Sequence, residues 1–413
     1  MRNIAIVDTY ATSRRLAQKF REAGFACVRV QSSEETPAFY RSSPFNPDDF
    51  AANIVHSGSL HETLGKLAAF QPVAVIAGGE TGVELADALS EALGLLSNGT
   101  RLSSARRNKY TMIETVRAAG LRAAEQLLIG SKGQLQRWHE QIGGRIVVKP
   151  ARSAASDGVH FCDSPEEAVA AYEELLGKEN ILSESNEAVV AQEYLVGTEY
   201  FLNTVSRAGR MHVCDIWRTV RADVNGIPDL LAGFYIVPVE GAVQEKLISY
   251  ATASLDALGI EYGPAHIEIK MTPDGPCLVE VGARVGGADS PYYAELATGE
   301  SQLNWSVDAY TDPERFDARC SEPYRMRQHF ASVVMMSPSK GTLRSYPFMS
   351  RVEQLESLYD IRPTVNPGDP ITYSVDDTSS PMTVNLMHRS EGIVMRDMAT
   401  LRYLDGPAFY DIV

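Results

Sequence analysis

The chain has 413 residues, 44% of them apolar and 22% charged, so it is long enough for several packed units and disorder does not dominate it. Its formal net charge of -15 argues against a nucleic-acid partner, whose binding surface would need clustered Lys and Arg. The five scattered cysteines form no C-x-x-C pair, which favours a reducing, cytoplasmic location, and no apolar run approaches the ~18 residues of a membrane span.

The first 100 residues alternate predicted strands and helices. Buried strands are predicted at 4–7, 26–30 and 73–77, and helices at 13–23 and from after residue 82 to about residue 93. This order favours a parallel sheet with crossover helices. The turn Gly78-Gly79-Glu80 follows a strand, where ligands bind in such sheets, but it is equally a tight strand-to-helix turn. Glu80 is a candidate for contact with a substrate ammonium group, although an acidic residue before a helix is also favourable structurally.

The next segment begins with a helix predicted from Asn108 to Gly120 and continues with a strand at 145–150. Lys149 stands at the end of this apolar strand, which is unusual for packing and suitable for binding phosphate oxygens. Residues 151–158, called here the small-residue loop, offer hydroxyls and small side chains that let backbone N–H groups approach phosphates. A flexible surface loop has the same composition, so this pattern is weak evidence when taken alone.

Strands are predicted throughout 188–237, and a helix follows from 242 to 258. The segment Gln192-Glu193-Tyr194-Leu195 ends an apolar strand, and Glu199 follows it closely. Backbone groups at such a strand end can bind an adenine edge, and the carboxylate can bind ribose hydroxyls. An edge strand with a solvated turn explains the same pattern.

The most informative stretch is a predicted hairpin over 264–282. Thr272-Pro273-Asp274-Gly275 has turn chemistry, and a three-residue loop would place Thr272 opposite Pro276 and Glu268 opposite Glu280. In this register one face is entirely apolar, with members Ile267, Ile269, Met271, Cys277, Val279 and Val281. A two-residue loop would put the two glutamates on opposite faces of a regular hairpin.

Two directly opposed carboxylates destabilise a sheet unless a cation compensates them. Their hard oxygens suit Mg²⁺, so Glu268 and Glu280 are candidate metal ligands. In the alternative interpretation the hairpin is exposed, and Lys270 and Arg284 balance the glutamates. His266 lies on the same face and is a candidate to orient a substrate carboxylate or to take a proton from an amine. A hydrogen-bonded structural histidine is an equal alternative.

The order of these parts resembles the ATP-grasp superfamily over residues 101–310. The shared features are a lysine at a helix start, a Lys-Pro strand end, a small-residue loop, a Gln-Glu-Tyr-Leu segment followed by Gly-Thr-Glu, and a two-glutamate hairpin followed by an arginine and glycines. The resemblance implies an α/β ATP-grasp fold of two α+β lobes that sandwich ATP. The expected divisions are a Rossmann-like domain at 1–100, a small lobe at 101–190, a large lobe with the metal site at 191–315 and a small β-rich region at 316–413.

The resemblance also implies roles for individual residues. Lys109 and Lys149 look like the two phosphate-binding lysines, and Ser153, Ser156 and Gly158 belong to the loop that closes over the phosphates. Gln192, Glu193, Tyr194 and Leu195 resemble the adenine-binding segment, and Glu199 resembles the ribose ligand. Glu268 and Glu280 look like ligands of Mg²⁺, with Mn²⁺ as an alternative. Arg284 resembles the arginine that stabilises the acyl phosphate, and Gly286 and Gly287 would offer backbone N–H groups to a carboxylate or phosphate.

One position departs from the family pattern. Many members carry asparagine two residues after the second glutamate as a further metal ligand, where this chain has Gly282. The Glu280-Val281-Gly282-Ala283-Arg284 form, with His266 before the first glutamate, is similar to the L-amino-acid ligases of the bacilysin-synthetase and dapdiamide-synthase kind.

The implied chemistry joins two small molecules, a carboxylic acid and an amine, which are expected to be amino acids. ATP phosphorylates the acid, and the amine then displaces phosphate to give an amide, with ADP as the nucleotide product. Other ATP-grasp enzymes, of the biotin-carboxylase or purine-pathway type, and a non-catalytic nucleotide-binding protein are the rival interpretations. Family habit suggests a homodimer, and no nucleic-acid or membrane partner is expected.

Overall fold

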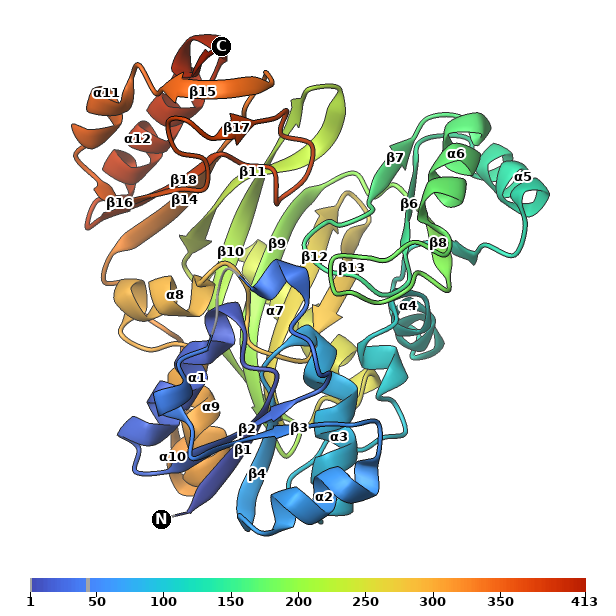
Figure 1. Ribbon diagram of the computed structural model, residues 1–413, viewed down its shortest axis with the longest axis vertical. Helices are drawn as coiled ribbons and strands as arrows, with labels where there is room; N and C mark the ends of the chain where they lie inside the picture. The colour runs from blue at the N-terminus through green and yellow to red at the C-terminus, as the bar shows by residue number, and fades with distance from the viewer. Residues whose placement is uncertain (1, 42–44) are drawn as a thin grey trace.

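The computed structural model describes residues 2–41 and 45–413. Its N-terminal region is a parallel sheet in the order β3-β2-β1-β4 with helices on both faces (Figure 1). The elements are β1 (Asn3–Val7), α1 (Arg14–Glu22), β2 (Ala26–Gln31), β3 (Ala52–Val55), α2 (Leu60–Ala68), β4 (Pro72–Ala77) and α3 (Val83–Ala92). The strands are mainly apolar because both faces of the sheet are covered. The parallel sheet predicted for this region is confirmed, although β3 and α2 had no predicted counterpart.

A separate antiparallel sheet forms the green lobe of Figure 1, in the order β5-β8-β6-β7. Its members are β5 (Gln126–Leu128), α5 (Lys132–Ile142), β6 (Ile146–Pro150), β7 (His160–Cys162), α6 (Pro165–Leu175) and β8 (Val189–Glu193). The two helices pack their apolar residues against the strands. Helix α4 (Lys109–Ala118) precedes this lobe, and its Met112, Ile113 and Val116 join the core of the largest sheet.

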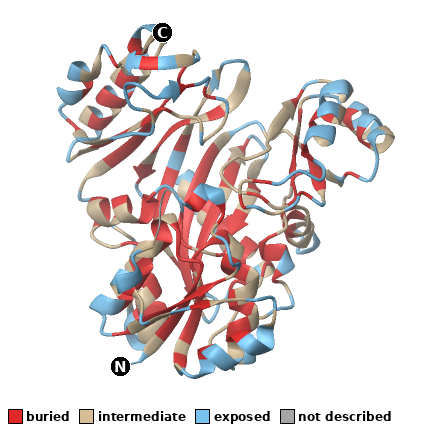
Figure 2. Cartoon of the chain, in the orientation of Figure 1, coloured by how far each residue is buried: buried red, intermediate tan, exposed pale blue. Residues whose placement is uncertain are grey.

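The largest sheet runs in the order β13-β12-β9-β10-β11-β14-β18-β16 through the middle of the molecule, and Figure 2 shows how thoroughly it is buried. Its strands are β9 (Thr198–Arg207), β10 (Arg210–Val224), β11 (Ile227–Val237), β12 (Gly263–Thr272), β13 (Gly275–Gly282), β14 (His329–Met335), β16 (Leu358–Pro363) and β18 (Met382–His388). The associated helices are α7 (Ala242–Ala257), α8 (Ser290–Thr298), α9 (Gln302–Thr311) and α10 (Pro313–Arg319). In the described part of the chain, no helix is long and apolar enough to cross a membrane.

The C-terminal region is joined to this sheet, because β14 pairs with β11 of the large lobe. It also has a small sheet, β17-β15-β19, and two helices. Its further elements are β15 (Gly341–Ser345), α11 (Met349–Glu353), β17 (Pro370–Ile371), α12 (Glu391–Leu404) and β19 (Asp411–Ile412). Short strands were expected here, but α12 was not. The division into four domains stays a prediction, and β8 and α10 span the expected limits at residues 190 and 315.

The hairpin β12–β13 differs from its predicted form in its loop. Thr272 pairs with Gly275, so the loop has two residues, and the Thr272 hydroxyl accepts from the N–H of Asp274 at 3.2 Å and donates to the carbonyl of Gly275 at 2.9 Å. The ladder shifts register by one residue beside Val279, and this β-bulge returns Glu280 to its place opposite Glu268. Consequently the expected apolar face was wrong at two positions. Cys277 pairs with Lys270 and Val279 lines a cavity, while Leu278 pairs with Ile269 and is buried in the core.

Candidate active site

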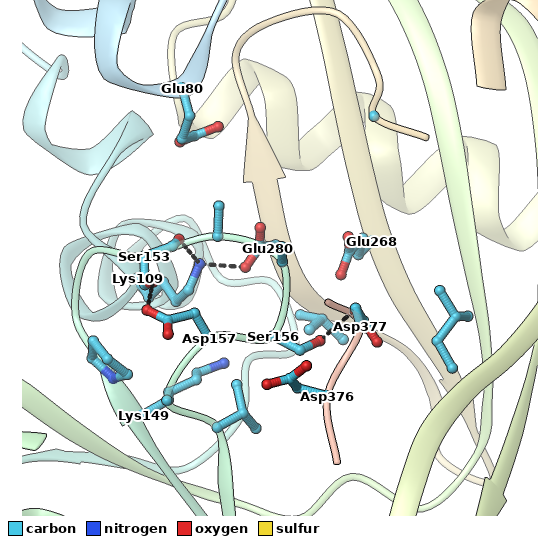
Figure 3. A pocket seen from close by; sticks show the side chains of 18 of the residues that line it. Glu80, Lys109, Lys149, Ser153, Ser156, Asp157, Glu268, Glu280, Asp376 and Asp377 are labelled. Atoms are coloured by element: carbon cyan, nitrogen blue, oxygen red, sulfur yellow. Dashed lines mark hydrogen bonds and ion pairs between the residues drawn. The ribbon is translucent and has the colours of Figure 1, made fainter. Parts of the chain in front are cut away.

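A cavity of about 990 Å³ lies where the N-terminal region, the small lobe, the largest sheet and a C-terminal loop meet. Every residue singled out from the sequence as a candidate for the site lines it, and Figure 3 shows some of them. These residues are Glu80, Lys109, Lys149, Ser153, Ser156, Gly158, Gln192, Glu193, Tyr194, Leu195, Glu199, His266, Glu268, Glu280, Arg284, Gly286 and Gly287. Segments far apart in the sequence therefore converge on one space.

The two hairpin glutamates are adjacent partners across the β12–β13 ladder and both face the cavity. Glu280 forms an ion pair with the ammonium group of Lys109. Glu268 lies 3.4 Å from Nε2 of His266. Burial would raise the pKa of Glu268, but the hydrogen bond and charge of His266 outweigh it and hold the pKa at about 2. Both carboxylates are thus placed to attract cations.

Few of the described side chains beside Glu268 and Glu280 could hold a divalent metal ion. Among residues 2–41 and 45–413, no three His, Cys, Asp or Glu side chains are grouped closely enough to hold a metal ion by themselves. Position 282 adds no donor because it is glycine, paired with His266 in the ladder. A divalent ion here would therefore take two protein carboxylates and complete its shell with phosphate oxygens and water, which is the usual habit of Mg²⁺.

The two lysines approach the same space from different elements. Asn108 caps α4 by accepting from the N–H of Thr111 at 3.1 Å, and the next residue, Lys109, also donates to the carbonyl of Ser153 at 3.1 Å. Lys149 ends the buried strand β6, and no hydrogen bond or ion pair to its ammonium group is found within the described residues. Burial and the nearby charge of Lys109 lower the pKa of Lys149 to about 8. An anion in the cavity would supply the missing partner.

The small-residue loop is held in an unusual backbone conformation beside these lysines. Ala155 and Ser156 have positive φ angles of 55° and 57°, which residues with a Cβ rarely adopt. Gly158 has φ +67°, and a Cβ on it would lie 2.7 Å from Leu175. Ser153 donates to the Asp157 carboxylate at 2.7 Å. The loop is therefore shaped by its neighbours and not free to take any conformation.

The segment predicted to hold adenine continues from the end of β8. Gln192 donates to Gln126 at 2.9 Å, and Glu193 accepts from the N–H of Glu125 at 3.1 Å. The Tyr194 ring packs edge-on against Phe161, with centroids 5.8 Å apart. These contacts fix the strand end, and Leu195 follows it at the cavity wall.

Glu199 is buried near two cations that the sequence did not point out as site residues. It forms an ion pair with Arg221, and the ammonium group of Lys270 lies 4.0 Å from its other oxygen. Burial is the largest influence on the pKa of Glu199 and raises it, against the charge of Arg221. Lys270 pairs with Asp229 at 2.5 Å, so it does not balance the hairpin glutamates as the alternative interpretation assumed.

The other end of the cavity is organised by Glu80. Its two oxygens accept from Arg107 at 2.8 Å and from Arg284 at 3.0 Å. Burial opposes its charge, but the two guanidinium groups outweigh burial and lower the pKa of Glu80. Glu80 thus positions the two arginines, and it also begins the short η4 helix (Glu80–Gly82), as the structural interpretation expected. Its contact with a substrate stays a prediction.

The two glycines after Arg284 differ in their surroundings. The N–H of Gly286 donates to Gln302 at 2.7 Å, and a Cβ on Gly286 would lie 2.4 Å from the Asn203 side chain. This glycine is required for packing, and its N–H is already engaged. For Gly287, no atom of the described residues beyond its chain neighbours lies within 4 Å of where a Cβ would be, so the chain is open to the cavity there.

His266 is supported from behind by a buried polar relay. Its Nδ1 lies 2.8 Å from the Asn203 amide oxygen, and the Asn203 amide nitrogen donates to Asp215 at 2.6 Å. Trp217 donates to the same Asp215 oxygen, while the other has no partner within the described residues. Burial raises the pKa of Asp215 to about 7. Because Asp215 fixes the Asn203 amide, Nδ1 of His266 donates to the Asn203 oxygen, and Nε2 faces Glu268.

Several lining residues have no distinctive pattern in the sequence. Arg221 on β10 and Asp377 between β17 and β18 enter the cavity only through long-range strand pairing. Tyr10 and Tyr40, stacked with ring centroids 4.8 Å apart, come from N-terminal loops. Lys270 was considered only as a counter-charge to the glutamates, although its place two positions after Glu268 on one strand could have indicated that it shares the same face.

Comparison with known proteins agrees with this architecture. An ATP-grasp domain model matches residues 142–291. The chain is 30% identical to dapdiamide A synthase of Enterobacter agglomerans over 414 residues, covering 98% of this chain and 96% of the relative. It is 24% identical to the L-arginine-specific L-amino acid ligase of Bacillus subtilis over half of each chain. The crystal structure of L-amino acid ligase from Bacillus licheniformis superposes with a TM-score of 0.76 at 19% identity, covering 100% of this chain and 98% of that one. The chain therefore belongs to the ATP-grasp family and is an ATP-dependent carboxylate–amine ligase.

Proposed function

We propose that this enzyme joins two amino acids, activating the carboxylate of one as an acyl phosphate and releasing ADP and phosphate. The observation that carries the proposal is the convergence of Lys109, Lys149 and Arg284 on a cavity that also contains the opposed Glu268 and Glu280. Such an arrangement suits the transfer of a phosphoryl group, in which positioning and charge neutralisation do most of the work. The names of the relatives, dapdiamide A synthase and L-amino acid ligases, favour amino acids as the substrates.

The nucleotide is proposed to lie between the two lobes. The end of β8, from Gln192 to Leu195, would hold adenine, and Glu199 would accept from the ribose hydroxyls. Lys149 would donate to phosphate oxygens, which supplies the partner that this buried ammonium group lacks. The N–H groups of the small-residue loop would close over the same phosphates.

Glu268 and Glu280 are proposed to hold Mg²⁺. A bound divalent ion would neutralise phosphate charge and relieve the repulsion between the two opposed carboxylates. Lys109 now takes part of that role by pairing with Glu280. With a metal ion at the glutamates, the Lys109 ammonium group would be free to turn toward the phosphates.

The acyl-transfer end is proposed to lie near Arg284 and His266. Arg284 is held by Glu80 at 3.0 Å, so its guanidinium plane is oriented before any substrate arrives. It would stabilise the charge that develops on the acyl phosphate during attack by the amine. His266, with Nε2 toward the cavity, would orient the carboxylate of the second substrate.

The test is phosphate release from Mg-ATP with pairs of L-amino acids, followed by mass spectrometry of each positive mixture. We expect a product whose mass equals the two amino acids minus water, accompanied by ADP and not AMP. Phosphate release that does not depend on an added acid and amine would contradict the proposed ligation. A variant with Glu280 replaced by glutamine serves as the inactive control.

A further inference from the structure

The tip of the small-residue loop is tied to the C-terminal region. The loop is also anchored to two other parts of the chain: Arg152 pairs with Glu84 of α3 at 2.7 Å, and Asp157 accepts from the N–H of Ile181 at 3.0 Å. At its tip, the Ser156 hydroxyl donates to the Asp377 carboxylate at 2.7 Å across the cavity (Figure 3). This bond joins positions 221 residues apart in the sequence.

The backbone conformation at the tip of the loop is unfavourable unless other contacts hold it. Ala155 and Ser156 are consecutive non-glycine residues with positive φ, a conformation that surrounding contacts must maintain. Among the described residues, the bond to Asp377 is the one that the Ser156 side chain makes. The shape of the loop over the proposed phosphate site therefore depends on a residue outside the two ATP-grasp lobes.

Asp377 is held out toward the loop by its own rigid surroundings. It lies in the segment 372–381 between β17 and β18, which Asn225 anchors by donating to the carbonyls of Ser337 and Ser374 at 2.9 Å each. The neighbouring Asp376 is used within the segment, where it accepts from the N–H of Thr378 at 2.9 Å. The side chain of Asp377 is therefore available to accept the hydrogen bond from Ser156.

The charge environment gives Asp377 a second link to the site. Burial raises the pKa of its carboxyl group and the charge of Arg221 opposes this effect, while the charge of Glu268 adds to it. Arg221 is the same residue that pairs with Glu199. The C-terminal segment, the proposed ribose ligand and one hairpin glutamate therefore meet around a single guanidinium group.

We propose that Asp377 is a positioning residue of this ligase, which holds the small-residue loop closed over the nucleotide phosphates through its hydrogen bond with Ser156. The proposal rests on the proposed nucleotide site. It gives the C-terminal region a part in nucleotide binding, with the loop tip clamped between that region and the small lobe.

The test measures the affinity of the intact enzyme for Mg-AMPPNP by titration calorimetry, in the wild type and in Ser156→Ala, Asp377→Ala and the double variant. We expect each single change to weaken binding about tenfold, as for the loss of one hydrogen bond to a charged group. The double variant should be no weaker than either single one, because both changes remove the same bond. Asp377→Asn, which keeps an acceptor oxygen, should recover most of the affinity, and Thr378→Ala, in the same segment, should match the wild type.

Amide hydrogen exchange of residues 153–158 supplies a readout that needs no ligand. Exchange should be faster in Ser156→Ala and Asp377→Ala than in the wild type and in Thr378→Ala. Additive losses of affinity, or unchanged exchange in the loop, would overturn the tether. If the wild type bound no Mg-AMPPNP, the nucleotide site itself would be refuted, and the tether with it. Binding by the wild type and by Asp377→Ala with equal affinity would refute the tether alone.

Discussion

Replacing Glu280 by glutamine should separate catalysis from stability. Glutamine keeps the size of the side chain and an oxygen that can accept from Lys109, but it removes the charge proposed to bind Mg²⁺. Loss of one preorganised electrostatic contact of this kind lowers turnover by roughly 10²–10³, or about 3–4 kcal/mol in the barrier. We therefore expect a fall of at least that size in kcat/KM for the ligation reaction.

The effect on folding should be small for reasons visible in the hairpin. The Glu280 side chain is 21% exposed beside the cavity, and glutamine can still accept a hydrogen bond from Lys109, so losing the ionic part of this contact costs about 1 kcal/mol. Removing one of the two opposed carboxylates relieves their repulsion and stabilises the fold by about 0.2–1 kcal/mol. This gain nearly cancels the loss of the ion pair. The melting temperature should change by no more than about 4 °C.

Steady-state ADP release and thermal melting, measured on the same preparations, provide the assay. Asp274→Asn is the matched control, because it removes a carboxylate from the tip of the same hairpin, where the side chain is 82% exposed. This control should be neutral within about 0.5 kcal/mol and fully active. A Glu280→Gln enzyme with activity within threefold of the wild type would refute the metal assignment. Lost activity together with a melting temperature lower by more than about 10 °C would show instead that Glu280 is structural.

Three further predictions concern charged groups of the site. Because the pKa of Lys149 is lowered to about 8, this lysine loses its charge between pH 7 and 9, and the affinity for Mg-ADP should fall over that range. Lys149→Arg, which stays charged, should remove the pH dependence. A wild-type affinity that does not change with pH would contradict this prediction. Glu80→Gln should lower kcat/KM for ligation about 10–100-fold by loosening Arg284 but leave Mg-AMPPNP affinity unchanged; an equal loss of affinity would place Glu80 at the nucleotide. The pKa of Asp215 is raised to about 7, so its buried carboxyl lowers stability as pH rises from about 4 through 7. Asp215→Asn should therefore melt higher than the wild type at pH 8.5 but not at pH 5, and an equal difference at both pH values would contradict this.

Elements whose identity depends on local pattern could be predicted from the sequence. The strands β1, β2 and β4 are short, mainly apolar runs, and the predicted helices after β1 and β4 correspond to α1 and α3. The facing positions of Glu268 and Glu280 were also predicted correctly, although by way of the wrong loop. A two-residue loop with a bulge at Val279 gives the same pairing as a three-residue loop without one, and alternation alone does not distinguish them.

Features that depend on distant pairing could not be predicted in this way. The acidic side chain of Asp377 has no distinctive neighbours in the sequence, and it reaches the cavity because β14 extends the large-lobe sheet. Arg221 lies within a long strand whose facing residues are set by β9 and β11. The ion pairs of Glu80 could not be predicted because both of its arginine partners lie on other segments of the chain.

The central claim, that this ligase forms an amide through an acyl phosphate, is tested most directly by positional isotope transfer. The enzyme would be incubated with Mg-ATP and an amino acid carrying ¹⁸O in its carboxylate, together with the amine substrate found by the panel. If the acyl phosphate forms, one ¹⁸O atom should appear in each released phosphate. The amide should form in the same amount as the labelled phosphate, with ADP as the other product. Phosphate without ¹⁸O, or label found in AMP, would contradict an acyl phosphate intermediate.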